Sequence, residues 1–393
     1  MYPTISDLIK DIFGINIPLP IQSFGFFVAV SFVVGAWLIL IELKRKEREG
    51  IIFTLKKKVV VGKPASPHEL IIMAIFGFII GFKLLGIIFD YSSFTDNPQH
   101  FIFSGEGNIF GGILGAVILV YMKYRDKQKS KLDKPRTEDV EVHPYELTGN
   151  IILLGALFGI LGAKIFHNLE NLDEFAADPV DALFSFSGLT FYGGLILAAI
   201  AIIWYARKNN ILPLVISDVA APGIMIAYAI GRIGCQVAGD GDWGIANELA
   251  KPEWLGFLPD WFWAYDYPHN VINEGKEIIN CTGKHCFHLV PPVFPTPLYE
   301  TITCGILFAL MWIFRKRMKI TGMMFSVFLI MNGVERFFIE KIRVNTTYNI
   351  FGWQITQAEI ISTLLFITGI VLLIFIIRNH KKKMKLTETK PNS

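Results

Sequence analysis

The chain has 393 residues, of which 52% are hydrophobic and 33 are phenylalanine, and its formal net charge is only +3. A water-soluble domain of this length could not bury so much apolar surface, so the composition indicates a membrane protein. The basic residues stand in short clusters between apolar runs rather than along one face, which argues against a nucleic acid as partner.

Apolar runs long enough to span a bilayer, about 17–25 residues, recur along the whole chain. They predict an all-α polytopic membrane protein with about nine transmembrane helices. The first run lacks the layout of a cleavable signal peptide, because its basic cluster follows it, and we expect it to remain as a span. The expected spans lie near 21–43, 68–89, 107–124, 147–167, 188–206, 213–236, 297–315, 321–339 and 357–378.

The loops between these spans alternate in charge. Lysine and arginine gather in every second loop, in the stretches "KRKEREG", "KYRDKQKSKLDKPR", "ARKNN", "RKRMK" and "RNHKKKMK". The positive-inside rule places these loops in the cytoplasm. The N-terminus and a long loop at about 239–296 would then be exterior, and the basic tail at 379–393 cytoplasmic, which requires an odd number of spans.

An internal repeat lies in the first half of the chain, with copies that start at His68 and Tyr145. Each copy is predicted to be a two-helix hairpin, and both begin on the cytoplasmic side. They therefore run parallel, unlike the inverted repeats of many transporters. We expect one membrane domain over 1–393, in which 65–140 is an extra hairpin with its cytoplasmic linker. The aligned pairs are Glu69/Glu146, Lys83/Lys164, Gly105/Gly188 and Gly111-Gly112/Gly193-Gly194. The glycine pairs permit close helix packing, which is the role expected in the first copy.

Two cysteines, Cys281 and Cys286, share the exterior loop in the stretch "CTGKHC". A disulfide between them and two free thiols are both compatible with the sequence. His285 and His288 add zinc as a further alternative, but the second separated ligand pair typical of zinc sites is missing. No metal site is expected.

Charged residues inside apolar runs are the strongest functional signal. Arg232 follows a long apolar run, and Arg336 precedes Glu340 by four residues and Arg343 by seven, near one helical face. An arginine at the bilayer centre costs about 2.5–3.5 kcal/mol on insertion scales, so it usually meets an anion. Two other interpretations stay open: Arg232 extends to the headgroups, and Arg336 and Glu340 only neutralise each other. Two arginines at similar depth favour a site for an anion such as lipid phosphate.

Five motifs in order resemble those of the prolipoprotein diacylglyceryl transferases, a family of bacterial inner-membrane enzymes. They are "GLTFYGGLI", "DVAAPGIMIAYAIGRIGCQVAGDGDWG", "FPTPLYE", "GVERFFIEKIR" and "TQAEIIS". The resemblance covers 20–43 and about 145–375, so 145–378 would be the family-like core. The first hairpin copy lies outside it, and would add two spans to the seven that are usual in the family.

The resemblance implies transfer of the diacylglyceryl group from phosphatidylglycerol to the lipobox cysteine thiol of preprolipoproteins, which forms a thioether and releases glycerol phosphate. The implied partners are phosphatidylglycerol, preprolipoprotein signal peptides with a lipobox cysteine, and other membrane lipids; no cofactor is implied. By position, Arg232 and Arg336 would hold the phosphate, Glu340 would orient Arg336, and Tyr192 would lie at the reaction centre. The substrate-binding residues carried over are Asp240, Asp242, Tyr299, Glu300, Arg343, Gly193, Gly194 and Gln357.

The chain departs from the family pattern at four positions. Tyr192 replaces the histidine before Gly-Gly, Cys235 and Ala238 replace asparagines, and Phe24 replaces a tyrosine. A tyrosine, with a pKa near 10, is a poor base, so Tyr192 could instead donate a hydrogen bond to a lipid oxygen. An inactive lipid-binding or accessory paralogue is therefore the alternative function. A transporter is less favoured, because the spans show no pair broken by proline at the midplane.

Overall fold

The computed structural model describes residues 1–15, 17, 21–96, 101–102, 104–184, 190–350 and 353–388. Each predicted span coincides with a helix over most of its described residues. The long helices are α2 (Ser23–Arg48), α3 (Pro67–Phe89), α6 (Ile109–Lys129), α7 (Thr148–Glu170), α10 (Phe191–Lys208), α11 (Pro213–Ala238), α12 (Thr296–Phe314), α13 (Met323–Glu340) and α14 (Gln357–Glu388). The short ones are α1 (Ile5–Phe13), α4 (Tyr91–Asp96), α8 (Leu172–Ala177), α9 (Pro179–Phe184) and the 3-10 turns η1 (Pro144–Leu147), η2 (Glu253–Leu255) and η3 (Asp260–Phe262).

Seven helices among the described residues are long and apolar enough to cross a membrane, and the chain is a polytopic membrane protein. The seven are α2, α3, α7 together with η1, α10, α11, α12 and most of α14. The two further spans expected from the sequence, α6 and α13, carry more charge. Membrane crossing by α6 and α13, and with it the count of nine, stays a prediction.

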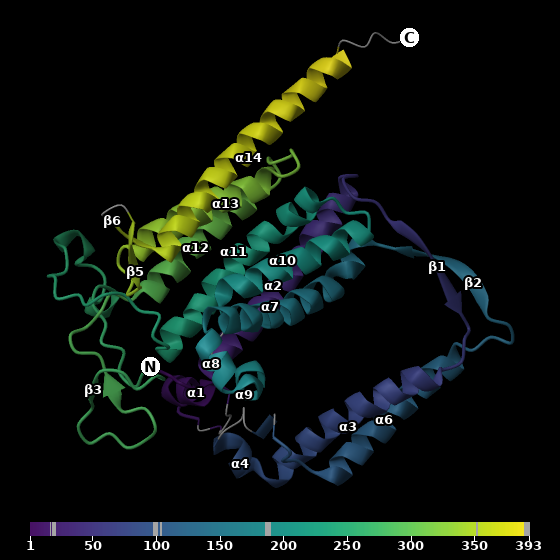
Figure 1. Ribbon diagram of the computed structural model, residues 1–393, viewed down its shortest axis with the longest axis horizontal. Coiled ribbons are helices and arrows are strands. Elements are labelled where there is room, and N and C mark those ends of the chain that lie inside the picture. The colour runs from purple at the N-terminus through teal and green to yellow at the C-terminus, as the bar shows by residue number, and fades with distance from the viewer. Residues whose placement is uncertain are drawn as a thin grey trace.

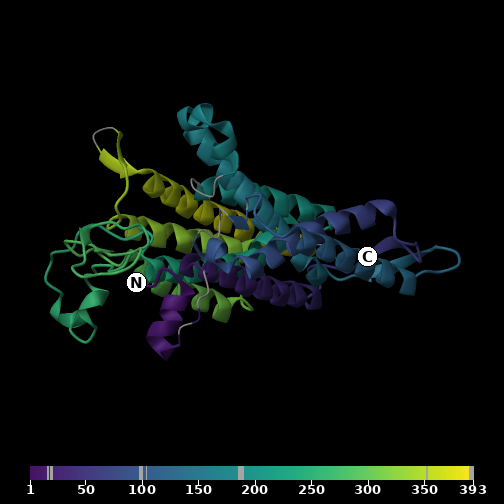
Figure 2. The same ribbon diagram turned by 90° about the horizontal axis from the view of Figure 1, so that it is seen from below.

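The two predicted sets of loops lie at opposite ends of the helices. The chain start and the segment 239–295 share one end, while the C-terminal part of α14 reaches the other (Figure 1). Figure 2 shows the same segment, in green, beside the N-terminus. The amino group of Met1 donates a hydrogen bond of 2.6 Å to the carbonyl of Pro268 and fixes this contact. Which end faces the cytoplasm stays a prediction from the charge pattern.

Helix α11 is the central helix of the bundle and packs against α2, α12 and α13. Its apolar side chains belong to two buried clusters, one around Val215 and Val219 and one around Ala221 and Met225. Asp218 of α11 is almost completely buried, and its carboxylate accepts hydrogen bonds from the backbone N–H groups of Gly322 and Phe325 at 2.7 and 2.9 Å. Asp218 thereby satisfies amide groups at the start of α13 and fixes that helix against α11.

The two hairpin copies, α3–α6 and α7–α10, pack through glycine. A Cβ atom added to Gly81 would clash with the carbonyl of Gly111, and one added to Gly162 would clash with the carbonyl of Gly193. Both contacts bring helix backbones closer than any larger residue allows. The repeated glycines therefore have a packing role in both copies; Gly188, which the sequence aligns with Gly105, lies outside the described residues.

Three short antiparallel strand pairs, which the sequence did not predict, lie between helices of the mostly helical chain. They are β1 (Leu55–Val61) with β2 (Arg136–Val142), β3 (Lys276–Glu277) with β4 (Phe287–His288), and β5 (Thr347–Ile350) with β6 (Trp353–Thr356). The β1–β2 pair connects the first hairpin to the bundle, and Leu55 lies opposite Val142 at its bundle end. Thr54 precedes β1 and His143 follows β2, and both contact Glu47 of α2. Glu47 accepts a 3.1 Å hydrogen bond from Thr54 and lies 2.7 Å from His143 Nδ1.

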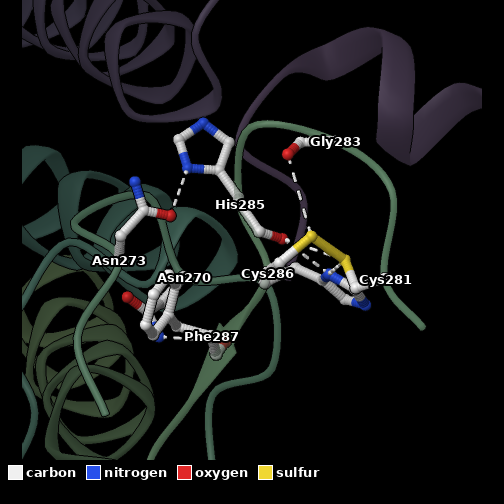
Figure 3. The surroundings of a disulfide bond; sticks show 8 residues. Asn270, Asn273, Cys281, Gly283, His285, Cys286 and Phe287 are labelled. Carbon is white, nitrogen blue, oxygen red and sulfur yellow. Dashed lines mark hydrogen bonds between the residues drawn. A yellow bond between two sulfur atoms is a disulfide. The ribbon is translucent and has the colours of Figure 1, made fainter. Parts of the chain in front are cut away.

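The segment after α11 folds over the end of the bundle around its own small core of Trp243, Tyr267, Leu289 and Val293. Cys281 and Cys286 form a disulfide within it (Figure 3). Both sulfurs are therefore unavailable as zinc ligands. A disulfide is typical of proteins or segments outside the reducing cytosol, which agrees with the exterior position that the charge pattern predicts.

Candidate functional site

A buried carboxylate, that of Glu300 on α12, joins three arginines. Oε2 of Glu300 lies 2.7 Å from Nε of Arg232, while Oε1 lies 3.1 Å from Nη1 of Arg336 and 3.4 Å from Nη1 of Arg343. The side chain of Glu300 is 0% exposed. A carboxylate can be buried in this way only when cations and hydrogen bonds compensate its charge. The arginines that the sequence singles out thus meet at one point, and Glu300 is the residue that joins them.

Tyr228 completes this centre and was not anticipated from the sequence. Its hydroxyl donates a hydrogen bond of 2.9 Å to Oε1 of Glu300 and accepts one of 3.1 Å from Nη2 of Arg232. Tyr228 lies one turn before Arg232 on α11, so the helical spacing of four residues was the signal that could have revealed it.

Arg232, Arg336 and Arg343, with the carboxylates that bind them, form an arginine network. Asp242 forms the accessible edge of this network. Its Oδ2 binds Nη1 of Arg232, and its Oδ1 accepts a 2.7 Å hydrogen bond from Nη2 of Arg343. Helix α11 ends at Ala238, and the capping residue Gly239, with a φ of 65°, turns the chain back toward Arg232. The carboxylate of Asp242 is 38% exposed, whereas that of Glu300 is fully buried.

The two aspartates of this turn have opposite electrostatic environments. Burial by itself would raise the pKa of Asp242, but the guanidinium groups of Arg232 and Arg343 outweigh it and hold that pKa below its ordinary value. Burial and, next, the neighbouring Asp242 carboxylate raise the pKa of Asp240. Asp240 instead accepts a 3.3 Å hydrogen bond from the backbone N–H of Asp242 and so shapes the turn.

The contacts of Arg232 and Arg336 exclude the two other interpretations of these arginines, an extension toward the headgroups and an isolated ion pair with Glu340. Arg336 does pair with Glu340 on its own helix, at 3.0 Å, but it also reaches Glu300 on α12. Arg232 is only 12% exposed and binds inward, to Glu300 and Asp242. Neither arginine is an isolated ion pair or a side chain that extends toward the headgroups.

Tyr192 lies at the start of α10, half-buried, with its ring against Phe191 at a centroid distance of 5.8 Å. It is an electrostatic neighbour of Arg336. The following pair, Gly193 and Gly194, is buried against α7, where added Cβ atoms would meet Phe166 and the carbonyl of Gly159. The glycine pair thus positions Tyr192 through close helix packing.

Two expected site residues lie apart from the network. The hydroxyl of Tyr299 donates a 2.7 Å hydrogen bond to the carbonyl of Phe262, which fixes the segment after α11 to α12. Gln357 is exposed at the first position of α14. Among the described residues, the hydrogen bonds and ion pairs of the arginine network involve neither of these two side chains.

One group in this region has metal-ligand chemistry. Cys235, Asp240 and Asp242 bring a thiol and two carboxylates within 4.8 Å of one another. The Asp242 carboxylate is already shared by two arginines, which would compete with a cation for its oxygens. The donor set therefore fits the arginine network better than a metal ion.

Comparison with known proteins gives one family. The model for prolipoprotein diacylglyceryl transferase matches residues 10–144 and 129–375. The first match includes the first hairpin copy, which we expected to lie outside the resemblance.

Individual relatives agree with the family match. A protein of Corynebacterium efficiens named phosphatidylglycerol–prolipoprotein diacylglyceryl transferase is 29% identical over 218 residues, which are 54% of this chain and 63% of the relative. The proteins of the same name from Corynebacterium diphtheriae and Vibrio vulnificus are 31% and 28% identical, over 52% and 62% of this chain and 69% and 79% of their own lengths. The chain thus spans less than two thirds of the Corynebacterium efficiens relative.

Proposed function

The chain belongs to the prolipoprotein diacylglyceryl transferase family, and from this membership we propose that it transfers the diacylglyceryl group of phosphatidylglycerol to the lipobox cysteine of preprolipoproteins. The reaction forms a thioether and releases glycerol phosphate. The proposed location is the bacterial inner membrane, where both the lipid and the signal peptides of the acceptors are found. No cofactor takes part.

The chemistry sets two demands on the site. A sulfur nucleophile forms a bond to the terminal glycerol carbon while the bond from that carbon to the phosphate oxygen breaks. The site must therefore provide a thiolate, which is the reactive form of cysteine, and stabilise the negative charge that develops on the leaving phosphate. Fixed arginines meet the second demand, because their planar donors match phosphate oxygens in pairs.

The arrangement of Asp242 is the observation that carries the proposal. Its two carboxylate oxygens each bind a different arginine, Arg232 and Arg343. The two free oxygens of a phosphodiester have the same charge and similar spacing, so the lipid phosphate can take the place of this carboxylate. Asp242 is partly exposed and follows a glycine, and a small movement of the turn would release it.

Charge balance indicates that a carboxylate must leave when the lipid phosphate binds. Arg232, Arg336 and Arg343 face the carboxylates of Glu300, Glu340 and Asp242, so the formal charges of these groups cancel. An added phosphate would leave the buried network negative unless a carboxylate moves out. We expect Glu300 and Glu340 to remain as the fixed supports of Arg232 and Arg336, and Asp242 to be the carboxylate that leaves.

The experiment is complementation of a bacterial strain depleted of its own diacylglyceryl transferase, followed by a transfer assay. Membranes that contain the chain should move labelled diacylglyceryl from phosphatidylglycerol to a lipobox peptide. The peptide with serine in place of cysteine is the control, since it lacks the thiol. Growth rescue together with cysteine-dependent transfer supports the proposal.

The second candidate is a non-catalytic lipid-binding paralogue, favoured by Tyr192 and Cys235 at positions where the family has histidine and asparagine. It predicts retention of phosphatidylglycerol by the purified protein without transfer to the peptide. Binding without transfer, in a folded protein at matched amounts, would therefore replace the proposed reaction with this alternative.

A further inference from the structure

A buried carboxylate outside the arginine network remains without a partner. Glu335 of α13 is only 7% exposed, and neither of its side-chain oxygens has a hydrogen-bond partner among the described residues. Buried polar groups are almost always hydrogen-bonded, and an unmatched one is costly. The cost is tolerated where the group has a function.

Glu335 lines a groove of about 480 Å³ between α12 and α13. Its other walls are formed almost entirely by apolar side chains, among them Leu307 of α12 and Met331 and Ile339 of α13. Val334 and Phe338 at its rim are exposed, so the groove is open toward the surroundings of the bundle. A ligand that enters it must be largely apolar and carry one hydrogen-bond donor that reaches Glu335.

The position of Glu335 relative to the arginines is set by the helix. It directly precedes Arg336, and consecutive helical residues point about 100° apart. Arg336 turns toward Glu300, while Glu335 lines the groove. Glu300 and the three arginines that it binds, Arg232, Arg336 and Arg343, are all electrostatic neighbours of Glu335. A donor held at Glu335 is thus close to the proposed phosphate site but reaches it from a different side.

We propose that Glu335 accepts the proton of the acceptor thiol, and that the α12–α13 groove admits the apolar peptide segment that carries this thiol. The inference rests on the proposed function. A cysteine in an apolar peptide fits the groove, because its S–H is the single donor in otherwise apolar surroundings. As the S–H proton moves to a Glu335 oxygen, the sulfur electron pair forms the bond to the glycerol carbon. The electron pair of the C–O bond leaves with the phosphate, which then takes the proton from Glu335.

This assignment supplies a base other than Tyr192. A positioned general base contributes about 10²–10⁴-fold to the rate. The sequence did not reveal it, because Glu335 stands among charged residues of a family motif whose pattern leaves this position open.

The test compares two acceptor peptides, one with cysteine and one with selenocysteine at the lipobox position, in membranes of the full-length protein with phosphatidylglycerol. A selenol ionises at lower pH than a thiol and needs no base near neutral pH. Glu335→Gln should slow transfer to the cysteine peptide about 10²–10⁴-fold but leave transfer to the selenocysteine peptide within about 5-fold of wild type.

The control is Glu359→Gln, which removes a carboxylate that is also buried, at 6% exposure, but is bonded to the backbone N–H of Thr356 and to Lys341. It should leave the ratio of the two rates as in the wild-type protein. Should Glu335→Gln not fold, Glu335→Asp is measured instead; it withdraws the carboxylate by one methylene and should lower the cysteine rate more than the selenocysteine rate.

An equal loss with both peptides, or no loss with either, would overturn the assignment of Glu335. A loss confined to the apparent affinity for phosphatidylglycerol would also overturn it, since the donor at Glu335 would then be a headgroup hydroxyl. Absence of transfer to both peptides by the wild-type protein would instead reject the proposed function itself.

Discussion

Arg232 and Glu300 meet across the contact between α11 and α12, where Nε of the arginine lies 2.7 Å from Oε2 of the carboxylate. Because Glu300 also binds Arg336 and Arg343, the position of each guanidinium depends on the same buried side chain. The arginines are therefore fixed before any substrate arrives, which is the condition for strong stabilisation of a developing charge.

Substitution of Arg232 by lysine tests the phosphate site. Arg232→Lys keeps the charge but cannot reproduce the planar pair of donors, and we expect transfer to fall by about 10²-fold or more. Arg336→Lys should behave similarly, and the double variant should be little worse than either single one if the two act as a unit. Labelled diacylglyceryl transfer at equal protein levels is the measurement.

The matched control for this substitution is Arg315→Lys. Arg315 is also mostly buried and ion-paired with a buried carboxylate, that of Glu42 at 3.1 Å, but at a different place in the bundle. It should lose comparable structural contacts and keep its transfer rate per folded molecule. If Arg232→Lys retains near-normal transfer, Arg232 does not hold the phosphate.

Substitution of Tyr192 by phenylalanine shows whether its phenol acts as a hydrogen-bond donor or as an essential base. If the phenol only donates a hydrogen bond to the lipid, Tyr192→Phe should cost about 1–2 kcal/mol in the transition state, or roughly 5- to 30-fold in rate. Loss of a base would cost about 10²–10⁴-fold. Tyr192→His should retain activity if the site accepts the smaller ring.

Tyr205→Phe is the control for Tyr192, since Tyr205 lies on the same helix and its hydroxyl accepts a 2.7 Å hydrogen bond from Asn150. Its transfer rate should be unchanged. Full activity of Tyr192→Phe would remove Tyr192 from the site.

The adjacent aspartates should respond oppositely to pH. The lowered pKa of Asp242 means that its ionised form stabilises the fold above the ordinary carboxyl pKa of about 3.9, and that this stabilisation is lost as pH falls below it. The raised pKa of Asp240 means that the fold loses stability as pH rises through the range between the ordinary and the raised value.

Thermal unfolding of Asp242→Asn and Asp240→Asn in detergent checks these signs. At pH 7, Asp242→Asn should unfold at a lower temperature than wild type and Asp240→Asn at a higher one. The Asp240→Asn difference should shrink as pH falls to about 4, where ordinary carboxyl groups become protonated, whereas the Asp242→Asn difference should shrink only below that pH. Shifts of the same sign at pH 7 would contradict the two environments.

Reporter fusions test the predicted orientation. A reporter after Asn209, or at the C-terminus, should show cytoplasmic activity, and one placed between Glu274 and Lys284 should show exterior activity. The charge pattern of the loops is the physical reason. An exterior C-terminal reporter would reject the arrangement with nine spans.

The first hairpin should be dispensable for chemistry. Among the described residues, its loop offers the carbonyls of Phe101, Ser104 and Glu106, which accept hydrogen bonds of 2.5–2.7 Å from Lys83, rather than a free cation for phosphate. Removal of 55–142 joins Thr54 to His143, which Glu47 already holds together. The shortened protein should show lower stability or assembly but a near-normal transfer rate per folded molecule.

A change confined to the β1–β2 pair, such as Val59→Thr with Val60→Thr, is the control for this deletion and should keep both accumulation and transfer. Normal accumulation of the deletion variant without transfer would show that the hairpin takes part in the reaction.

The sequence predicts the helices well because a bilayer demands long apolar runs, and Arg232 and Arg336 stand out because charge in such a run is costly. Glu300 as the common partner of three arginines depends on contacts between distant helices, which no local pattern contains. Glu335 does not stand out in the sequence, because its motif "GVERFFIEKIR" contains several other charged residues. The β1 strand, with its lysines, has the composition of a linker, and only its pairing with β2 makes it a strand.

The β1–β2 pair also bears on how the protein melts. Helices α3 and α6 pack mainly on each other, and no described bundle helix packs against them to a similar extent. Cooperative unfolding requires shared buried contacts, and a two-stranded connection supplies few of them. Heating should therefore melt the hairpin and the bundle in two separate transitions.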